Sequence, residues 1–319
     1  MLVNGKWHKD FHPVQSDDGE GGFVREASKL RNWVTPDGSP GPTGTGGFKA
    51  EAGRYHLYVA LICPWASRTL MARKLKGLEE VISISILDPR LTPRVWRFGG
   101  TPEAMPNTDA DPLYGAEYLY ELYLKANPAY TGQITVPVLW DRRSETMVNN
   151  ESSEIIRMLN SGFGDLANNG IDLYPDELRH EIDEINDRLY ERFNNGVYRA
   201  GFATTQNAYE VAVHDVVDSL DFLEQRLEEQ DYLVGNRLTE ADIRAFVTLI
   251  RFDLAYHGLF KINLRQVREY PNLRAYVRRI HGLPGIDETV DVEHIKTGYY
   301  SIEALNPAGI VPLGPETIW

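Results

Sequence analysis

The sequence predicts a two-domain protein, an α/β domain followed by an all-α domain. Two patterns lead to this prediction. Between residues 51 and 163, period-2 apolar runs alternate with helix-forming segments, the order expected of a βαβ unit extended by a hairpin and a further helix. From residue 172 to residue 319, apolar residues recur at helical spacing instead. The 319 residues, 42% of them hydrophobic, suffice to form a core in each domain.

An N-terminal extension, residues 1–50, precedes the α/β domain. It ends in a Gly- and Pro-rich loop, residues 35–47, which resists both helix and strand because Gly and Pro favour turns. A linker is the simplest interpretation of such a composition. Trp33 and Phe48 on either side of the loop suggest that it packs on the body of the protein.

The βαβ unit is expected from residues 55–86. Residues 55–61 alternate apolar and polar positions as a half-buried strand does. A helix over 67–77 carries cations in its last turns, and Gly77 is placed to cap it. Residues 81–86 read Val-Ile-Ser-Ile-Ser-Ile, a second strand. The order strand, helix, strand implies that the two strands run parallel.

The remainder of the α/β domain, up to residue 163, is expected to contain a helix, a hairpin and a second helix. The helix covers 117–126, and residues 135–141 and 146–148 form the two strands of the hairpin. Residues 149–152 offer N-cap side chains for the last helix, which is amphipathic.

The all-α domain, residues 172–319, is expected to contain four helices. The first two carry apolar stripes, while Thr239 with Asp242 forms a capping box for the third, and Pro271 begins the fourth. The stripes consist of Ile182, Ile185, Leu189 and Phe193 in the first helix and of Val213, Val216, Leu220, Leu223 and Leu227 in the second.

Charge and composition argue against several classes of function. The 33 Lys and Arg against 46 Asp and Glu give a net charge of −13, which disfavours nucleic acid and anionic membranes as partners. Without a long apolar run or an N-terminal signal pattern, a cytoplasmic location is expected. The His residues lack metal-ligand spacing, and the glycines 44–47 precede a strand instead of opening a helix, so neither a metal nor a nucleotide is expected.

Cys63 is the only cysteine of the chain and lies between a predicted strand and a predicted helix. A lone cysteine is often inert and buried. At a helix start, however, backbone N–H groups and the helix dipole stabilise a thiolate, and Pro64 fits the first helical turn. Ala66 occupies the position where a second cysteine would allow dithiol cycling. A mixed disulfide at Cys63 must therefore be resolved by an external thiol.

Two further signals accompany the cysteine. Val136-Pro137 before a strand is compatible with a cis-proline that exposes the preceding backbone to an extended peptide, although prolines also occur at strand edges without a function. Glu151-Ser152 at a helix start offers N–H donors and a hydroxyl to the carboxylate of a ligand. Simple helix capping is the alternative for this pair.

With an all-α domain behind them, these three signals resemble the glutathione transferase superfamily. Six segments narrow the resemblance: Arg31-Asn32-Trp33, the loop Pro40–Phe48, Tyr55–Val59, Cys63-Pro64-Trp65-Ala66, Asn194–Tyr198 and Leu249–Asp253. Through them the sequence is more closely similar to the Xi class of this superfamily, the glutathionyl-hydroquinone reductases, over nearly the whole chain. The resemblance implies a thioredoxin-like N-terminal domain with a helical C-terminal domain, glutathione as co-substrate, and a homodimer.

The resemblance also implies roles for individual residues. Cys63 would be the nucleophile and Tyr198 the proton donor, with Tyr256 and Tyr299 binding the hydroquinone; outside the family, tyrosines mostly serve packing. Family members often carry a basic residue where Gln133 stands, so a salt bridge to glutathione would be missing or supplied by Arg94 or Arg97. The glutathione site would consist of Trp96, Gly132, Gln133, Ile134, Thr135, Val136, Glu151 and Ser152.

The expected function is the glutathione-dependent reduction of glutathionyl-hydroquinones to hydroquinones through a Cys63–glutathione mixed disulfide, with release of glutathione disulfide. Two alternatives remain open. An omega-like thioltransferase or dehydroascorbate reductase would use the same thiol on other acceptors. A non-catalytic binding module of the same fold would need no reactive thiol.

Overall fold

The computed structural model describes residues 1–8, 18–168 and 170–315. The chain divides into two compact units that do not follow the order of the sequence. The first unit comprises Met1–Phe11, Ala27–Ile171 and Glu288–Gly298. The second comprises His12–Glu26, Asp172–Asp287 and Tyr299–Trp319. The chain therefore passes from the second unit back to the first between Glu26 and Ala27.

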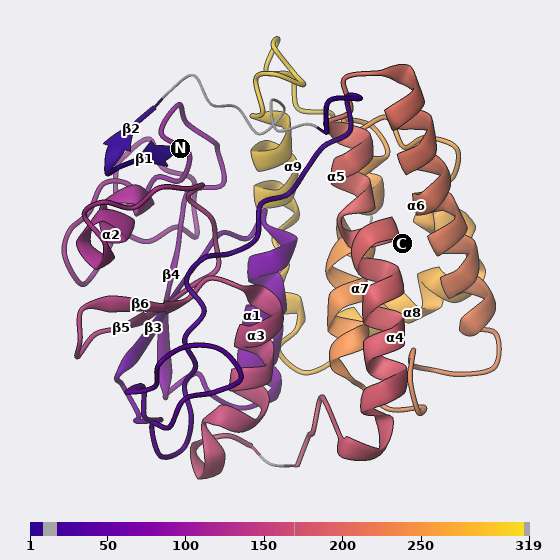
Figure 1. The fold of residues 1–319 in the computed structure, drawn as a ribbon. Helices are drawn as coiled ribbons and strands as arrows, with labels where there is room; N and C mark the ends of the chain where they lie inside the picture. The colour runs from indigo at the N-terminus through magenta and orange to yellow at the C-terminus, as the bar shows by residue number, and fades with distance from the viewer. Residues whose placement is uncertain (9–17, 169, 316–319) are drawn as a thin grey trace. The chain divides into compact units, whose positions relative to one another are not determined.

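A four-stranded mixed sheet in the order β4-β3-β5-β6 forms the centre of the first unit (Figure 1). Strand β3 (Tyr55–Val59) pairs in parallel with β4 (Ile82–Ile86), as the βαβ pattern predicts. Strand β5 (Val138–Asp141) runs antiparallel to β3 and forms a hairpin with β6 (Thr146–Asn149). The predicted parallel pair and hairpin are both confirmed.

Three helices accompany this sheet, α1 (Pro64–Leu75), α2 (Leu119–Ala126) and α3 (Ser152–Arg157). Helix α1 begins at Pro64, with Cys63 as its N-cap, and the left-handed Gly77 (φ 60°) follows its C-terminal end. Helices α1 and α3 pack against each other (Figure 1). Their N-terminal ends carry Cys63 and Glu151.

A short N-terminal hairpin was not expected from the sequence. Strands β1 (Leu2–Val3) and β2 (Lys6–Trp7) pair antiparallel. Leu2 also exchanges backbone hydrogen bonds with Gly132, at N–O distances of 3.1 and 3.0 Å. The hairpin therefore supports a segment from which several glutathione-site residues are predicted.

The Gly- and Pro-rich loop packs on the first unit, as its flanking aromatic residues indicate. Trp33 donates from Nε1 to the hydroxyl of Thr43 at 2.7 Å, and Phe48 is buried. Thr43 in turn donates to the backbone carbonyl of Arg31 at 2.6 Å. The loop is thus tied to the chain that precedes it.

The second unit is helical. Its capping box is formed as predicted, with the Thr239 amide donating to Asp242 Oδ2 at 2.8 Å. The short α5 and the last helix, α9, were not predicted; α9 begins in the first unit and ends in the second. The helices are α4 (Arg179–Leu189), α5 (Gly196–Gly201), α6 (Gln206–Arg226), α7 (Glu240–Arg251), α8 (Pro271–His281) and α9 (Val292–Tyr300).

Irregular helical turns extend three helices of the protein, one in the first unit and two in the second. Helices α3, α4 and α7 each continue into a π-helical turn, a form that often accompanies functional sites. The π-helical turns are Met158–Gly162, Tyr190–Asn194 and Phe252–Tyr256, and the 3₁₀ turns are Gly164–Leu166, Asp176–Leu178, Val267–Glu269 and Asp287–Thr289.

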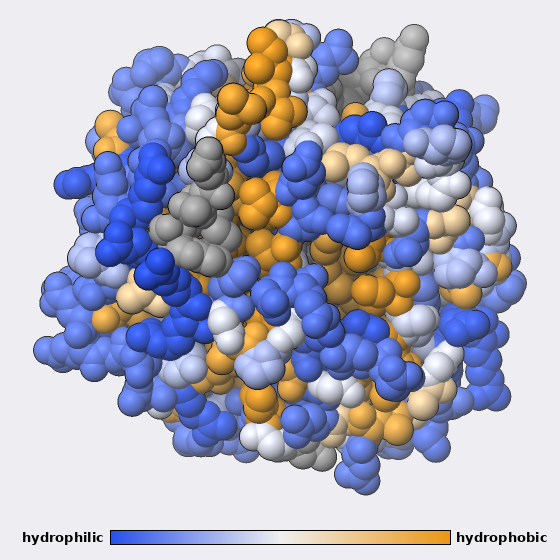
Figure 2. Space-filling view, turned by 180° about the vertical axis from the view of Figure 1, so that it is seen from behind, coloured by the Kyte–Doolittle hydropathy of each residue, from blue (hydrophilic) through white to orange (hydrophobic). Residues whose placement is uncertain are grey.

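The surface carries few large apolar side chains, and three of them lie close together near the end of the described chain. Ile310 and Leu313 are 69% and 95% exposed, with Val311 between them at 39%. Apolar side chains gather at the upper edge of the molecule in Figure 2, where this end of the chain lies in Figure 1. Within the described residues, no helix combines the length and the apolar character needed to cross a membrane.

Candidate active site

Cys63 is half-buried at the N-terminus of α1. Its thiol donates a hydrogen bond to the carbonyl oxygen of Val136, at an Sγ–O distance of 3.5 Å. The Val136-Pro137 peptide bond is cis, as the sequence suggested. The first turn of α1 contains no acidic side chain that would oppose a thiolate. The structure thus brings the cysteine and the Val-Pro signal together.

The segment before β5 is held by aromatic side chains. Trp96 donates from Nε1 to the carbonyl of Ile134 at 3.1 Å, and the Tyr123 hydroxyl donates to the carbonyl of Thr135 at 2.8 Å. Asn150, next to Glu151, donates to the Thr135 hydroxyl at 3.2 Å. These contacts join the predicted glutathione residues around Ile134 to those at the start of α3.

Glu151 is the N-cap of α3, and Ser152 is its first residue. The Glu151 carboxylate accepts hydrogen bonds from the backbone amide and the hydroxyl of Ser153, at 3.1 and 2.9 Å. Burial raises the pKa of Glu151, but these bonds, a bond from Ser28 and the charge of Arg68 outweigh burial and hold the pKa below its ordinary value. The group is therefore a carboxylate at neutral pH.

A buried arginine connects the N-terminal ends of α1 and α3. Arg68 is 1% exposed, and its guanidinium lies 4.4 Å from the ring centroid of Trp65. It donates from Nη1 to the Ser152 hydroxyl at 3.5 Å. The sequence alone does not single out Arg68, because only the fold brings a cation on α1 to Ser152.

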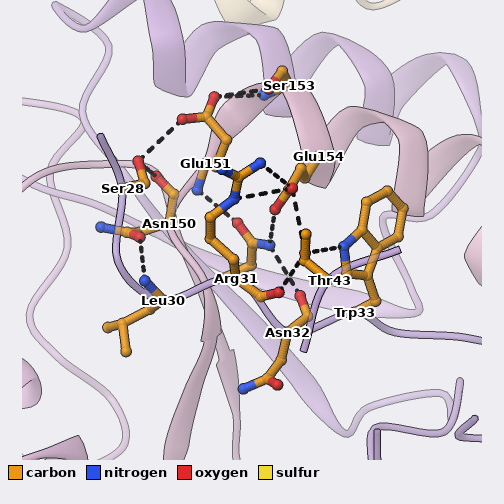
Figure 3. Close-up of polar contacts among 11 residues, drawn as sticks. Ser28, Leu30, Arg31, Asn32, Trp33, Thr43, Asn150, Glu151, Ser153 and Glu154 are labelled. Carbon is orange, nitrogen blue, oxygen red and sulfur yellow. Dashed lines mark hydrogen bonds and ion pairs between the residues drawn. The ribbon is translucent and has the colours of Figure 1, made fainter. Parts of the chain in front are cut away.

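The segment 28–33 forms a polar network with β6 and α3 (Figure 3). Ser28 donates to Glu151 Oε2 at 3.0 Å, and Asn149 donates from Nδ2 to the carbonyl of Asn32 at 2.9 Å. Arg31 forms an ion pair with Glu154, with Nε donating to Oε1 at 3.0 Å. The N-terminal extension thus contacts the first turn of the helix that is predicted to bind glutathione.

The basic residues considered as substitutes at Gln133 have other partners. Arg94 donates to the Tyr120 hydroxyl at 3.3 Å, and Arg97 forms an ion pair with Glu117 at 3.4 Å. The carbonyl of Gln133 accepts from the Tyr130 hydroxyl at 3.2 Å. A salt bridge from either arginine to glutathione stays a prediction.

The three predicted substrate tyrosines form one hydrogen-bonded cluster within the second unit. The Tyr299 hydroxyl lies 2.7 Å from that of Tyr198 and 2.8 Å from that of Tyr256. Tyr256 and Tyr299 are buried, whereas Tyr198 is half-buried. Their rings pack against those of Phe202 and Phe260. Tyr256 reaches this cluster from the end of a π-helical turn.

Burial sets the protonation of the two inner tyrosines. It raises the pKa of Tyr256 and of Tyr299 well above the ordinary value, negative charge on Tyr198 raises both further, and the buried Arg251 lowers both in part. Tyr256 and Tyr299 therefore remain neutral hydroxyls over the physiological range. Tyr198 is the most exposed of the three tyrosines, as a proton donor to a bound molecule would need to be.

The predicted residues fall into two groups, and each group is assembled within one unit. Cys63 and the predicted glutathione residues belong to the first unit, and the three tyrosines belong to the second. Among the described residues, no group of three or more His, Cys, Asp and Glu side chains is arranged to hold a metal ion.

Two family models match the chain on either side of this division. The N-terminal domain of glutathione S-transferases matches residues 62–161, and their C-terminal domain matches residues 206–279. A mixed sheet with its helices, followed by a helical unit, agrees with these two matched domains. The fold and the matches therefore define the class as that of the glutathione transferases.

Full-length relatives narrow the class. Glutathionyl-hydroquinone reductase YqjG of Escherichia coli (strain K12) is 50% identical over 316 residues, which cover 99% of this chain and 95% of the relative. Glutathionyl-hydroquinone reductase PcpF of Sphingobium chlorophenolicum is 47% identical, with 99% and 96% covered. The chain belongs to the glutathione transferase family, in its Xi class.

Solved structures agree with this assignment. The glutathione-bound structure of YqjG aligns with a TM-score of 0.90 at 48% identity, covering 99% of this chain and 96% of that chain. Glutathione transferase Xi from Phanerochaete chrysosporium aligns with a TM-score of 0.89 at 50% identity, covering 94% and 95%. The expected fold is therefore confirmed over nearly the whole chain.

Proposed function

We propose that this protein reduces glutathionyl-hydroquinones to hydroquinones with glutathione. The observation that carries the proposal is the half-buried thiol of Cys63 at the start of α1, which is hydrogen-bonded to the carbonyl oxygen of Val136. Relatives that are about half identical over almost the whole chain bear the name of this activity. Because the chain has no second cysteine, glutathione is also the natural resolving thiol.

The first half-reaction transfers the glutathionyl group to the enzyme. The Cys63 thiolate attacks the sulfur of the conjugate, an S–S bond forms, and the bond between sulfur and the aromatic carbon breaks. The ring carbon keeps the electron pair and takes a proton from Tyr198. The ring is thereby reduced to the hydroquinone, and the two sulfurs are oxidised to a mixed disulfide.

The second half-reaction restores the thiol. The thiolate of a second glutathione attacks the glutathione sulfur of the mixed disulfide, which releases glutathione disulfide and the Cys63 thiolate. The backbone of Val136 pairs with the peptide part of glutathione. The start of α3 binds its γ-glutamyl end, with the Glu151 carboxylate facing the ammonium group and Ser152 facing the carboxylate.

Tyr299 supports the proton donor. Its hydroxyl lies 2.7 Å from that of Tyr198, so it can donate a hydrogen bond to the phenolate that forms when Tyr198 loses its proton. Tyr256 lies 2.8 Å from Tyr299 and stays neutral, so it orients that donor. The three hydroxyls provide the polar groups for the ring oxygens of the hydroquinone.

An intact-mass experiment tests the proposal. The protein is mixed with a glutathionyl-hydroquinone in the absence of free glutathione, and we expect one glutathione adduct, located on Cys63 by peptide mapping, together with free hydroquinone. Added glutathione should remove the adduct. Faster turnover of dehydroascorbate or of a glutathionylated peptide than of the conjugate would favour the thioltransferase alternative, and absence of every adduct would favour a binding module.

We also propose that the protein is a cytoplasmic homodimer. The reaction requires a reduced thiol and a supply of glutathione, which a reducing compartment provides. The dimer is proposed by analogy with the superfamily. Sedimentation velocity over a range of protein concentrations tests it, and fractionation of the source cells tests the location.

A further inference from the structure

We propose that the four-residue segment Arg25–Ser28 is a positioning element for the reaction, in which Arg25 positions Tyr198 and Ser28 positions Glu151. The proposal rests on the proposed function, because it assigns these two partners to the proton donor and to the glutathione site. Two separate sets of contacts support it, one within each unit.

Arg25 lies over the face of the Tyr198 ring, with its guanidinium carbon 4.7 Å from the ring centroid. It is also directed by a hydrogen bond from Nε to Asn195 Oδ1 at 2.8 Å. Asn195 precedes the helix that carries Tyr198, and the amide of Tyr198 donates to its carbonyl at 3.0 Å. One side chain thus contacts both the ring of the proton donor and the residue at the base of its helix.

A cation at this place favours loss of the phenolic proton, because it attracts the electron density of the ring and the negative charge that develops on the oxygen. The two other tyrosines of the cluster, Tyr299 and Tyr256, keep their protons and therefore bring no charge to the Tyr198 hydroxyl. The charge of the buried Arg251 acts on those two tyrosines. Arg25, by contrast, is a cation that lies directly on the Tyr198 ring.

Arg199 provides a natural comparison, because it follows Tyr198 directly and yet points elsewhere. Its Nη1 forms an ion pair with Asp215 at 2.9 Å, and its Nε lies 3.7 Å from Glu191. Arg25, Asn195 and Arg199 also line a cavity of about 490 Å³. Both arginines can therefore be shortened without forcing a larger group into a packed core.

Ser28 acts on the proposed glutathione site, through Glu151. Its hydroxyl donates to Glu151 Oε2 at 3.0 Å, while Glu151 Oε1 is occupied by Ser153 (Figure 3). The two oxygens of the carboxylate are thus fixed by different residues. Removing Ser28 leaves Oε2 free to rotate away from the direction in which it would meet the ammonium group of glutathione.

The position of this segment in the sequence adds to the argument. Arg25 and Ser28 are three residues apart, and the chain passes from one unit to the other between Glu26 and Ala27. Both residues precede the two regions that match the family models, 62–161 and 206–279. The N-terminal extension therefore provides one contact to Tyr198 and one contact to Glu151. Neither Arg25 nor Ser28, which make these contacts, lies in the regions that the family models match.

The Arg25 part is tested by single-turnover kinetics of hydroquinone release, with Arg25→Gln, Arg25→Lys and the control Arg199→Gln. We expect Arg25→Gln to slow release by about 2-fold to 30-fold and to move the alkaline limb of the pH profile to higher pH, with partial rescue by Lys. The attack of Cys63 on glutathione disulfide, which protonates no carbon, should keep its rate. Equal effects of Arg25→Gln and Arg199→Gln, or an equal loss in both reactions, would overturn this part.

The Ser28 part is tested by measuring glutathione binding calorimetrically for Ser28→Ala, Ser28→Thr and the control Ser161→Ala. The control is chosen because, among the described residues, the Ser161 hydroxyl bonds only the carbonyl of Arg157. We expect Ser28→Ala to weaken binding by about threefold to tenfold, Thr to restore it, and the control to match the wild type. Unchanged binding by Ser28→Ala would overturn this part.

The two readouts separate this proposal from the proposed function. Glutathione binding is measured without any hydroquinone, so the Ser28 result stands even if the conjugate is not a substrate. Wild-type protein that forms no hydroquinone would contradict the proposed function and, with it, the Arg25 part. A wild type that reacts normally, with an unaffected Arg25→Gln variant, would contradict the Arg25 part alone.

Discussion

The Cys63 thiol donates to the carbonyl oxygen of Val136 at 3.5 Å, which joins the start of α1 to the segment that precedes β5. The contact places the sulfur beside the backbone that is proposed to pair with the peptide of glutathione. An attacking thiolate and the sulfur of a bound conjugate would then approach each other along a direction that the backbone determines.

Replacement of the nucleophile is the most direct prediction. Cys63→Ser should lower kcat for a glutathionyl-hydroquinone by at least about 1000-fold, because an alcohol is a much weaker nucleophile and cannot form the mixed disulfide. The thermal unfolding midpoint should change little, since Ser is nearly the size of Cys. Steady-state kinetics and calorimetry measure the two quantities. Residual turnover above one tenth of the wild-type rate would show that Cys63 is not the nucleophile.

The tyrosine cluster predicts a graded series. Tyr198→Phe should lower the rate of hydroquinone release by about 100-fold, the range typical of a lost general acid. Tyr299→Phe should cost less in rate but more in stability, about 1 to 3 kcal/mol, because it leaves the buried hydroxyl of Tyr256 without this partner. Single-turnover rates and denaturant unfolding check the series. A larger rate loss in Tyr299→Phe than in Tyr198→Phe would reverse the assignment of the donor.

The ion pair between Arg31 and Glu154 should contribute to stability. Glu154 is 7% exposed and also accepts from Asn149 Nδ2 at 2.8 Å. Arg31→Leu should therefore lower the free energy of unfolding by about 1 to 3 kcal/mol, since it leaves a buried carboxylate with fewer donors. Arg143→Leu is the control, because Arg143 pairs with Glu51 at 3.4 Å but its side chain is 71% exposed. This variant should change the free energy of unfolding by no more than about 0.5 kcal/mol. Similar losses in both variants would contradict the prediction.

His56 makes stability depend on pH. Burial lowers the pKa of His56 from 6.5 to about 4, and the ring contacts the hydroxyls of Ser83 and Ser85 at 2.7 and 3.0 Å. Between these pH values the unfolded chain binds a proton that the native ring does not, so the His56 contribution to stability falls as pH decreases from 6.5 towards 4, by up to about 3 kcal/mol.

The measurement is urea unfolding of the wild type and of His56→Gln at pH 7 and pH 5. Asp242 acts in the opposite direction, because burial raises its pKa to about 6 and its contribution is lost as pH rises. The difference between the two proteins removes the Asp242 effect. The wild type should lose more stability than His56→Gln on acidification, and parallel losses would refute the prediction.

Local sequence signals predicted the elements that they cap or pattern. Gly77 predicted the end of α1, the Thr239-Asp242 pair predicted the start of α7, and the alternation in 81–86 predicted β4. In each case the physical cause lies within a few residues, in a capping hydrogen bond or in the two-residue period of a strand. Of the elements that were missed, β1, β2 and α5 are 2, 2 and 6 residues long and carry no comparable signal.

Contacts between distant residues were the part that the sequence could not predict. Ser28 and Glu151 are 123 positions apart, and Arg25 and Asn195 are 170 apart. No spacing in the sequence predicts either contact, because only the folded structure determines which of these polar groups meet. The tyrosines were named through the family resemblance, but their shared hydroxyl contacts and the burial of Tyr256 and Tyr299 came from the structure.

The lone cysteine also determines how this protein responds to peroxide. A sulfenic acid formed on Cys63 has no other thiol in the chain with which to condense, so free glutathione is the thiol whose capture of it competes with further oxidation to the irreversible sulfinic acid. The product of that capture is the same mixed disulfide that the catalytic cycle resolves. Depletion of glutathione would therefore stop turnover and, at the same time, expose the enzyme to permanent inactivation.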